Sequence, residues 1–354
     1  MDILVLTVIA VVVLLGGFIY ILTRDGELKT PSGRGTIDVG EGSSAGSFEK
    51  FPLPDYVAKF VDNDFKSYLV EVEPGIKIHV LETGTGYPVY MQHGVPMSGF
   101  LYRKVANKLP KDQFRTIMPT LVGLGFSSKV PASQHTIENH TRWMNSLLNK
   151  LALDGLIFIG HDWGGSIGLG AIERSPNLLE GTVMLDSVIN APKENEKLPG
   201  TVRLIKTPGV GELLLEGLVS IYKQSPNQQA EPSSIPSEVN DALYARPVRE
   251  SGNGKGPLAI LRMVADKPDH PTAKQFDRIV AYVRGLDIPA EIVWGMKDPL
   301  MGDRLPDMKA NFPNARVTET AEGHFLQLEG EGPKAISAAV QRVYGQIQGN
   351  KKES

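Results

Sequence analysis

Apolar runs separated by polar turns recur along most of the chain and predict short strands. Between residues 67 and 82, apolar and polar positions alternate on both sides of Pro74-Gly75, which predicts a β-hairpin. Amphipathic segments at 137–153 and 333–347 predict helices among the strands. The remaining apolar runs predict strands at residues 89–92, 114–119, 156–160, 181–186, 290–295 and 315–320. Alternating strands and helices favour an α/β fold with a mostly parallel central sheet that helices cover on both faces.

The N-terminus has a different pattern. Residues 3–22 form an almost unbroken apolar run of 20 residues, the length at which a helix crosses a membrane. A cleaved signal peptide is the alternative, but no positive charge other than the terminal amine precedes the run, and no small-x-small cleavage site ends it. Arg24, Lys29 and Arg34 follow it. Because positive charge favours the cytoplasmic side, we expect a single-pass membrane anchor with a cytoplasmic catalytic domain.

Composition shifts define the remaining divisions of the chain. After the anchor, residues rich in Gly, Ser and Thr predict a flexible linker. The strand–helix alternation stops at about residue 190 and resumes near residue 276, and the intervening segment predicts a helical cap that would cover the substrate. The expected divisions are an anchor at 1–24, a linker at 25–50, a core at 51–189, the cap at 190–275, and the rest of the core at 276–348.

Charge and composition narrow the possible chemistry. The 354 residues carry a net charge of -3 without a basic cluster, so we expect no nucleic-acid partner. The chain has no Cys, which excludes a thiolate nucleophile and a Cys-ligated metal. The oligomeric state is left open.

One stretch carries the strongest chemical signal. The apolar run at 156–159 meets Gly160 and Gly164, with Asp162 midway between them, and a segment of small residues follows. This pattern predicts a tight strand-to-helix elbow that exposes the central side chain. A carboxylate in that place can attack carbon and form an ester on the enzyme itself. The alternative is that Asp162 only caps its own helix.

The partners that such a nucleophile needs follow in the expected chain order. His324 lies on a loop after the last predicted strand and is the candidate base. Asp298, after the strand at 290–295, is the first candidate for the acid that orients it, and Asp186, after the strand at 181–186, is the second. The backbone N–H groups of Val95 and Trp163 would form an oxyanion site.

These motifs together resemble those of the α/β-hydrolases with an aspartate nucleophile, and most closely the haloalkane dehalogenases. The resemblance extends from about residue 51 to 347. Its residues are His93-Gly94-Val95-Pro96, Leu101-Tyr102-Arg103-Lys104, His161-Asp162-Trp163-Gly164-Gly165, Gly295-Met296-Lys297-Asp298-Pro299-Leu300-Met301-Gly302 and Gly323-His324-Phe325-Leu326-Gln327.

The resemblance implies a two-step hydrolysis of a small-molecule substrate with no metal or organic cofactor. Asp162 would displace halide, and His324 would activate water against the resulting ester. The indole N–H of Trp163 would hold the leaving halide. One feature departs from the family pattern, because Val95 offers no side-chain donor for a second halide contact.

Two other functions are compatible with the same residues. An epoxide hydrolase shares the nucleophile and the His-Gly-x-Pro motif, but it needs two cap tyrosines as proton donors, for which Tyr222 and Tyr244 are the candidates. A membrane-tethered ligand-binding protein could keep the fold without turnover. Release of halide, formation of a diol, or neither would distinguish the three.

Overall fold

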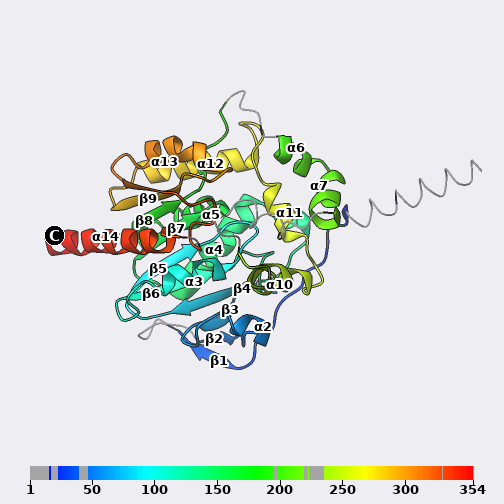
Figure 1. Ribbon diagram of the computed structural model, residues 1–354, viewed down its shortest axis with the longest axis horizontal. Coiled ribbons are helices and arrows are strands. Elements are labelled where there is room, and N and C mark those ends of the chain that lie inside the picture. Colours follow the sequence, from blue (N-terminus) through cyan, green and yellow to red (C-terminus); the bar gives the residue numbers. More distant parts are fainter. Residues whose placement is uncertain are drawn as a thin grey trace, which may run out of the picture.

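The computed structural model describes residues 16, 23–39, 47–193, 198, 200–218, 222, 235–328 and 330–353. In these ranges, ten strands form one sheet in the order β1-β2-β3-β4-β6-β5-β7-β8-β9-β10 (Figure 1). The strands are β1 (Thr36–Asp38), β2 (Ser47–Lys50), β3 (Lys66–Glu73), β4 (Ile76–Thr83), β5 (Tyr87–Gln92), β6 (Phe114–Pro119), β7 (Leu156–His161), β8 (Leu179–Leu185), β9 (Ala290–Gly295) and β10 (Arg316–Thr320).

The sheet has an antiparallel part and a parallel part. Strands β1 to β4 pair antiparallel, and β4 also pairs antiparallel with β6. From β6 to β10 every pairing is parallel, which confirms the predicted mostly parallel sheet. All six residues of β7 are buried. A strand buried on both faces favours apolar residues on both, which explains the continuous apolar run at residues 156–159.

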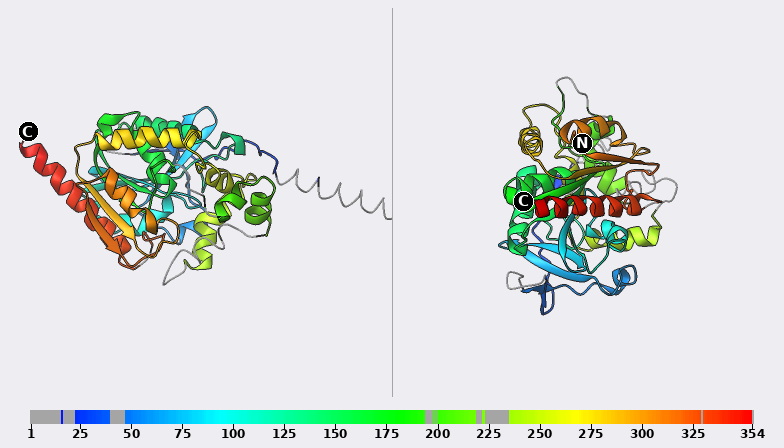
Figure 2. Two further views of the ribbon diagram at one scale, coloured as in Figure 1. Left: turned by 90° about the horizontal axis from the view of Figure 1, so that it is seen from above. Right: turned by 90° about the vertical axis from the view of Figure 1, so that its left-hand side faces the viewer.

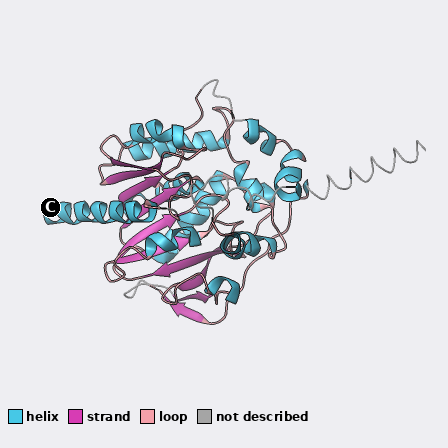
Figure 3. Cartoon of the chain, in the orientation of Figure 1, coloured by secondary structure: helices cyan, strands magenta, loops and turns pink. Residues whose placement is uncertain are grey.

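Helices cover both faces of the parallel strands (Figure 3). Helices α4 (Ile137–Leu151), α5 (Trp163–Ile172) and α12 (Pro271–Arg284) contact one another on one face, while α3 (Arg103–Ala106) and α14 (Gly332–Glu353) lie on the other. Helix α14 extends beyond the strands towards the C-terminus (Figures 1 and 2). Both predicted helices are present, and Thr136 caps α4 by accepting from the N–H of Asn139. The short helices α2 (Asp55–Ala58) and α13 (Leu305–Asn311) complete the core.

The segment predicted as a cap is largely helical where the structure describes it. It lies at one end of the sheet and contains α6 (Gly200–Lys206), α7 (Val210–Glu212), α9 (Ser237–Asn240), α10 (Arg246–Arg249) and α11 (Gly256–Leu261) (Figure 1). Two π-helical turns follow α7 and α9, at Leu213–Leu218 and Asp241–Ala245. Helix α12 starts inside the expected cap boundary of residue 275, yet it packs against α4 and α5 and so belongs with the core.

The described part of residues 25–50, expected as a flexible linker, is hydrogen-bonded to the body of the protein. Asp25 accepts hydrogen bonds from the N–H and hydroxyl of Ser133, each at 2.7 Å. The amide of Asn253 in the cap donates to the carbonyl oxygens of Glu27 at 2.7 Å and Val130 at 3.1 Å. This segment therefore joins the core and the cap.

The predicted membrane anchor at residues 3–22 lies outside the described residues except for Gly16. Within the described chain, no helix combines the length and the apolar character that crossing a membrane requires. The anchor and the cytoplasmic location therefore stay predictions from the sequence.

Candidate active site

The elbow predicted at Asp162 is present between β7 and α5. Asp162 has φ 51° and ψ -132°, a strained backbone conformation for a non-glycine residue. A Cβ atom on Gly164 would lie 2.2 Å from the carbonyl oxygen of Gln92, so only glycine fits there. Asp162 occupies the N-cap position of α5, but its side chain makes no capping hydrogen bond. The simple capping interpretation therefore does not account for this residue.

A backbone N–H group binds one oxygen of the Asp162 carboxylate. The N–H of Val95 donates to Oδ1 at 2.8 Å. The side chain is buried, and burial raises the pKa of Asp162, while the nearby imidazole of His324 and the N–H groups of Trp163 and Val95 oppose this rise. Of the two N–H groups predicted as an oxyanion site, that of Val95 is hydrogen-bonded to this carboxylate, and that of Trp163 acts to lower its pKa.

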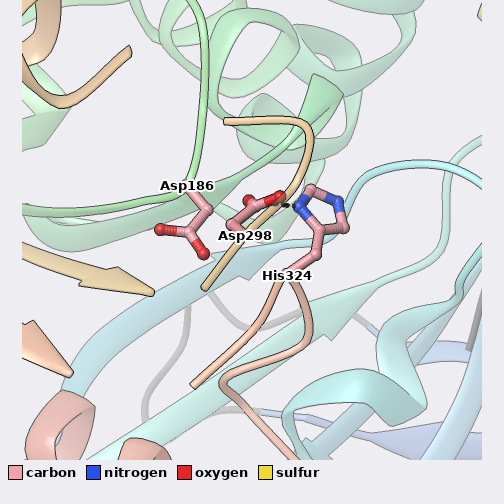
Figure 4. Close-up of side chains that lie close together, drawn as sticks. All are labelled: Asp186, Asp298 and His324. Carbon is pink, nitrogen blue, oxygen red and sulfur yellow. Dashed lines mark hydrogen bonds and ion pairs between the residues drawn. The ribbon is translucent and has the colours of Figure 1, made fainter. Parts of the chain in front are cut away.

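His324 lies between two carboxylates. Its Nδ1 atom is 2.7 Å from Oδ2 of Asp298 (Figure 4). Its Nε2 atom is 3.9 Å from Oδ2 of Asp162. The loop after β9 supplies Asp298, and the loop after β10 supplies His324. Burial alone would lower the pKa of His324, but Asp298 and then Asp162 raise it to about 9. The imidazole is therefore oriented by one carboxylate and faces the other across a gap longer than a hydrogen bond.

Of the two candidate acids, Asp298 is the one in contact with the imidazole. Its Oδ1 atom also accepts from the N–H of Leu300 at 2.7 Å. Burial acts to raise the pKa of Asp298, but the charge and hydrogen bond of His324 outweigh burial, and the pKa is lowered. Asp186 lies beside this pair, fully buried at the end of β8 (Figure 4). The three residues place ligand-type atoms within 4.8 Å of one another, but the Nδ1–Oδ2 contact already engages two of them.

The two cap tyrosines have different environments. The hydroxyl of Tyr244 accepts a hydrogen bond from Nη1 of Arg103 at 3.2 Å. The hydroxyl of Tyr222 is buried and has no hydrogen-bond partner in the described chain.

The proposed leaving-group donor, Trp163, is 7% exposed and packs against Phe276 of α12, with ring centroids 6.2 Å apart.

Two side chains that sequence reasoning did not single out also support the site. His161 contacts the carbonyl oxygen of His324 through Nε2 at 2.8 Å. The hydroxyl of Ser187 donates to the carbonyl oxygen of Asp162 at 2.8 Å. His161 is next to Asp162 in the sequence, and that position was the available signal for it. The role of Ser187 depends on its three-dimensional position after β8.

A cavity of about 760 Å³ lies elsewhere in the described chain, between residues 23–25 and the N-termini of α4 and α12. Asp162, Asp298 and His324 are not among its lining residues. Its shape therefore does not inform on the substrate of the triad.

The fold and this triad define the class of protein. A family model described as alpha/beta hydrolase fold matches residues 87–331, and the chain belongs to that family. It is a hydrolase similar to haloalkane dehalogenases. Haloalkane dehalogenase 2 of Mycobacterium tuberculosis is 27% identical over 274 residues, which cover 76% of this chain and 92% of the relative.

The chain is also similar to a decarboxylase in sequence and to a dehalogenase in structure. A cis-3-alkyl-4-alkyloxetan-2-one decarboxylase of Shewanella oneidensis is 27% identical over 272 residues, which cover 74% of this chain and 84% of the relative. The crystal structure of a loop variant of haloalkane dehalogenase DbeA from Bradyrhizobium elkanii matches with a TM-score of 0.70 at 20% identity, covering 82% of this chain and 99% of that one. The structural match establishes the shared fold.

Proposed function

We propose that the protein is a haloalkane dehalogenase that works through a covalent ester on Asp162. Oδ2 of Asp162 would attack the carbon that carries the halogen, forming a C–O bond while the C–halogen bond breaks and halide leaves. The observation that carries the proposal is the geometry of this carboxylate. The N–H of Val95 binds Oδ1, whereas Oδ2 lies 3.9 Å from Nε2 of His324 and is not hydrogen-bonded to it.

In the second step, His324 would take a proton from a water that attacks the ester carbonyl. Formation of the ester removes the negative charge of Asp162, which is one of the charges that raise the pKa of His324. The pKa of the imidazole therefore falls after the first step, and the ring becomes able to act as a base. Asp298 would stabilise the imidazolium that forms.

The same N–H groups would serve both steps. When water attacks the ester, negative charge develops on the carbonyl oxygen that was Oδ1 of Asp162. The N–H of Val95 is already 2.8 Å from that atom, and the N–H of Trp163 interacts with the same carboxylate. Donors that are in place before the reaction stabilise the developing charge without reorganisation.

The side chain of Val95 favours a second candidate function. Its apolar side chain provides no donor for a departing halide, which favours a substrate whose leaving group stays attached, as in an epoxide or a four-membered lactone. Tyr222 has a buried hydroxyl without a described partner and could donate to an epoxide oxygen, while Tyr244 is engaged by Arg103. The decarboxylase relative makes a dialkyl oxetan-2-one the third substrate class to test.

The decisive experiment traps the ester. Full-length His324→Gln protein should gain the mass of the alkyl group on Asp162 when it is mixed with a bromoalkane, because alkylation proceeds but hydrolysis stops. Asp162→Asn protein is the matched control and should gain no mass. With the native chain, release of bromide, diol or alkene with carbon dioxide identifies the substrate class. Alkylation at another residue would refute the proposed nucleophile.

A further inference from the structure

Asp186 is a buried acid for which the hydrolytic mechanism has no role. It follows β8 and has φ 26°, one of three positive φ values at non-glycine residues in the described chain. Its carbonyl oxygen accepts from the N–H of Asp162 at 3.1 Å, and its side chain is fully buried. Strained backbone of this kind persists where the surrounding structure requires it. Its position beside the nucleophile and the proposed acid therefore needs an explanation.

Hydrogen bonding at Asp186 is incomplete. Its Oδ1 atom accepts from the N–H of Gly295 at 2.8 Å, but Oδ2 is buried without a donor in the described chain. The neighbouring carboxyl of Asp298 already accepts from His324 and Leu300. Carboxylate oxygens of Asp186 and Asp298 lie within 4.8 Å of each other, and two buried negative charges at this separation repel. A buried oxygen without a hydrogen-bond donor also destabilises the folded state. A single proton held between the two carboxyl groups removes both problems.

We propose that Asp186 is a positioning residue that carries this proton and donates an O–H hydrogen bond to the carboxylate of Asp298. The inference rests on the proposed function of the triad. The bond would fix the Asp298 side chain and leave His324 facing one full negative charge on that side instead of two. If both acids were ionised, the imidazole would hold its own proton more tightly and would be a poorer base.

The surrounding charges agree with this assignment. Burial, followed by the charge of Asp298, raises the pKa of Asp186 well above its usual range, while His324 and the N–H of Gly295 oppose the rise. Three other titratable groups lie near this cluster, namely Asp162, His161 and Glu322. Asp162 contacts Asp186 through the backbone, and burial and the charge of His324 keep the pKa of His161 well below its usual value.

Glu322 comes from the loop before His324, and its carbonyl oxygen would lie 2.9 Å from a Cβ atom on Gly295. Its carboxylate accepts from the N–H of Glu331 at 2.8 Å. Among these residues, His324 is the one that can carry a positive charge, and its Nδ1 atom is already in contact with Asp298.

The proton can be detected without any turnover. Carbon-13 NMR of the full-length chain, labelled at aspartate side-chain carboxyls, should show a protonated carboxyl at neutral pH that disappears in Asp186→Asn. The exposed Asp38→Asn is the control and should leave the protonated signal in place. If Asp186→Asn removes only an ionised signal, the proposal is overturned, whatever substrate the enzyme uses.

Steady-state kinetics then test whether Asp186 positions Asp298. Asparagine can still donate to Asp298 and leucine cannot, so Asp186→Leu should lower kcat at least about tenfold more than Asp186→Asn. Without the donor, Asp298 attracts the imidazolium more strongly, so the acidic limb of the kcat profile should move to higher pH in the leucine variant alone. Equal loss in both variants with unmoved profiles would show a structural role only. If no substrate is turned over, the NMR result still decides the protonation.

Discussion

The side chain of His161, next to the proposed nucleophile, contacts the backbone carbonyl oxygen of His324 at 2.8 Å. Because a carbonyl can only accept, Nε2 of His161 carries the hydrogen. The two rings are 4.6 Å apart between centroids, and both are buried. This contact joins the strand that presents Asp162 to the loop that presents His324. It therefore constrains the distance between Asp162 and His324, the groups proposed to act in the two steps.

Replacing His161 by leucine should lower kcat about tenfold, because the loop of His324 loses a buried hydrogen bond that sets its position. Glutamine keeps a donor, so His161→Gln should recover part of the loss. Rapid-mixing measurements with a bromoalkane should place the defect in hydrolysis of the ester, where His324 acts. A defect confined to ester formation would argue against this role.

A substitution at Gly94 tests the close approach of the His-Gly-x-Pro loop to Asp162, the proposed nucleophile. A Cβ atom at this position would lie 2.0 Å from Oδ1 of Asp162. Gly94→Ala should therefore displace the carboxylate or Val95 and lower kcat at least about a hundredfold.

Gly345 in α14 provides the matched control, because its added Cβ would meet no atom within 4 Å. Gly345→Ala should leave kcat unchanged and should stabilise the helix by about 0.5–1 kcal/mol in chemical unfolding. Equal kinetics for the two variants would show that the close approach at Gly94 has no catalytic consequence.

The sequence predicted the fold because each major strand has a continuous or alternating apolar pattern. It predicted the elbow because the two glycines and Asp162 are adjacent in the chain. The choice between Asp298 and Asp186 needed coordinates, since both acids follow parallel strands and so reach the same end of the sheet. The 2.7 Å contact with Nδ1 of His324 places Asp298 in contact with the ring.

The described part of residues 25–50 shows what composition does not predict. Its Gly-, Ser- and Thr-rich composition predicts flexibility, yet the amide of Asn253 donates to the carbonyl oxygen of Glu27. Main-chain groups make many of the contacts in this segment, including the pairing of Lys29 with Lys129. Main-chain hydrogen bonds are available to any residue type except proline at N–H, so composition does not reveal them.

Trp163→Phe should slow ester formation from a bromoalkane about a hundredfold, because it removes the proposed N–H donor to the departing halide. The His324→Gln background isolates this step. Phe276→Leu is the control, since it alters the packing of the indole and keeps the donor. If both substitutions slow the step equally, the indole acts by packing and not by binding halide.

The contact between His324 and Asp298 should make stability depend on pH in a defined direction. His324 has a pKa of about 9 in the folded protein against an ordinary value of 6.5. A raised pKa stabilises the folded state fully below the ordinary value, and the contribution disappears as pH rises through the folded value. Urea unfolding of the native chain and of Asp298→Asn should therefore differ most at about pH 6, by up to about 3 kcal/mol, and the difference should shrink towards pH 9. A difference that stays constant over this range would mean that His324 is neutral in the resting protein.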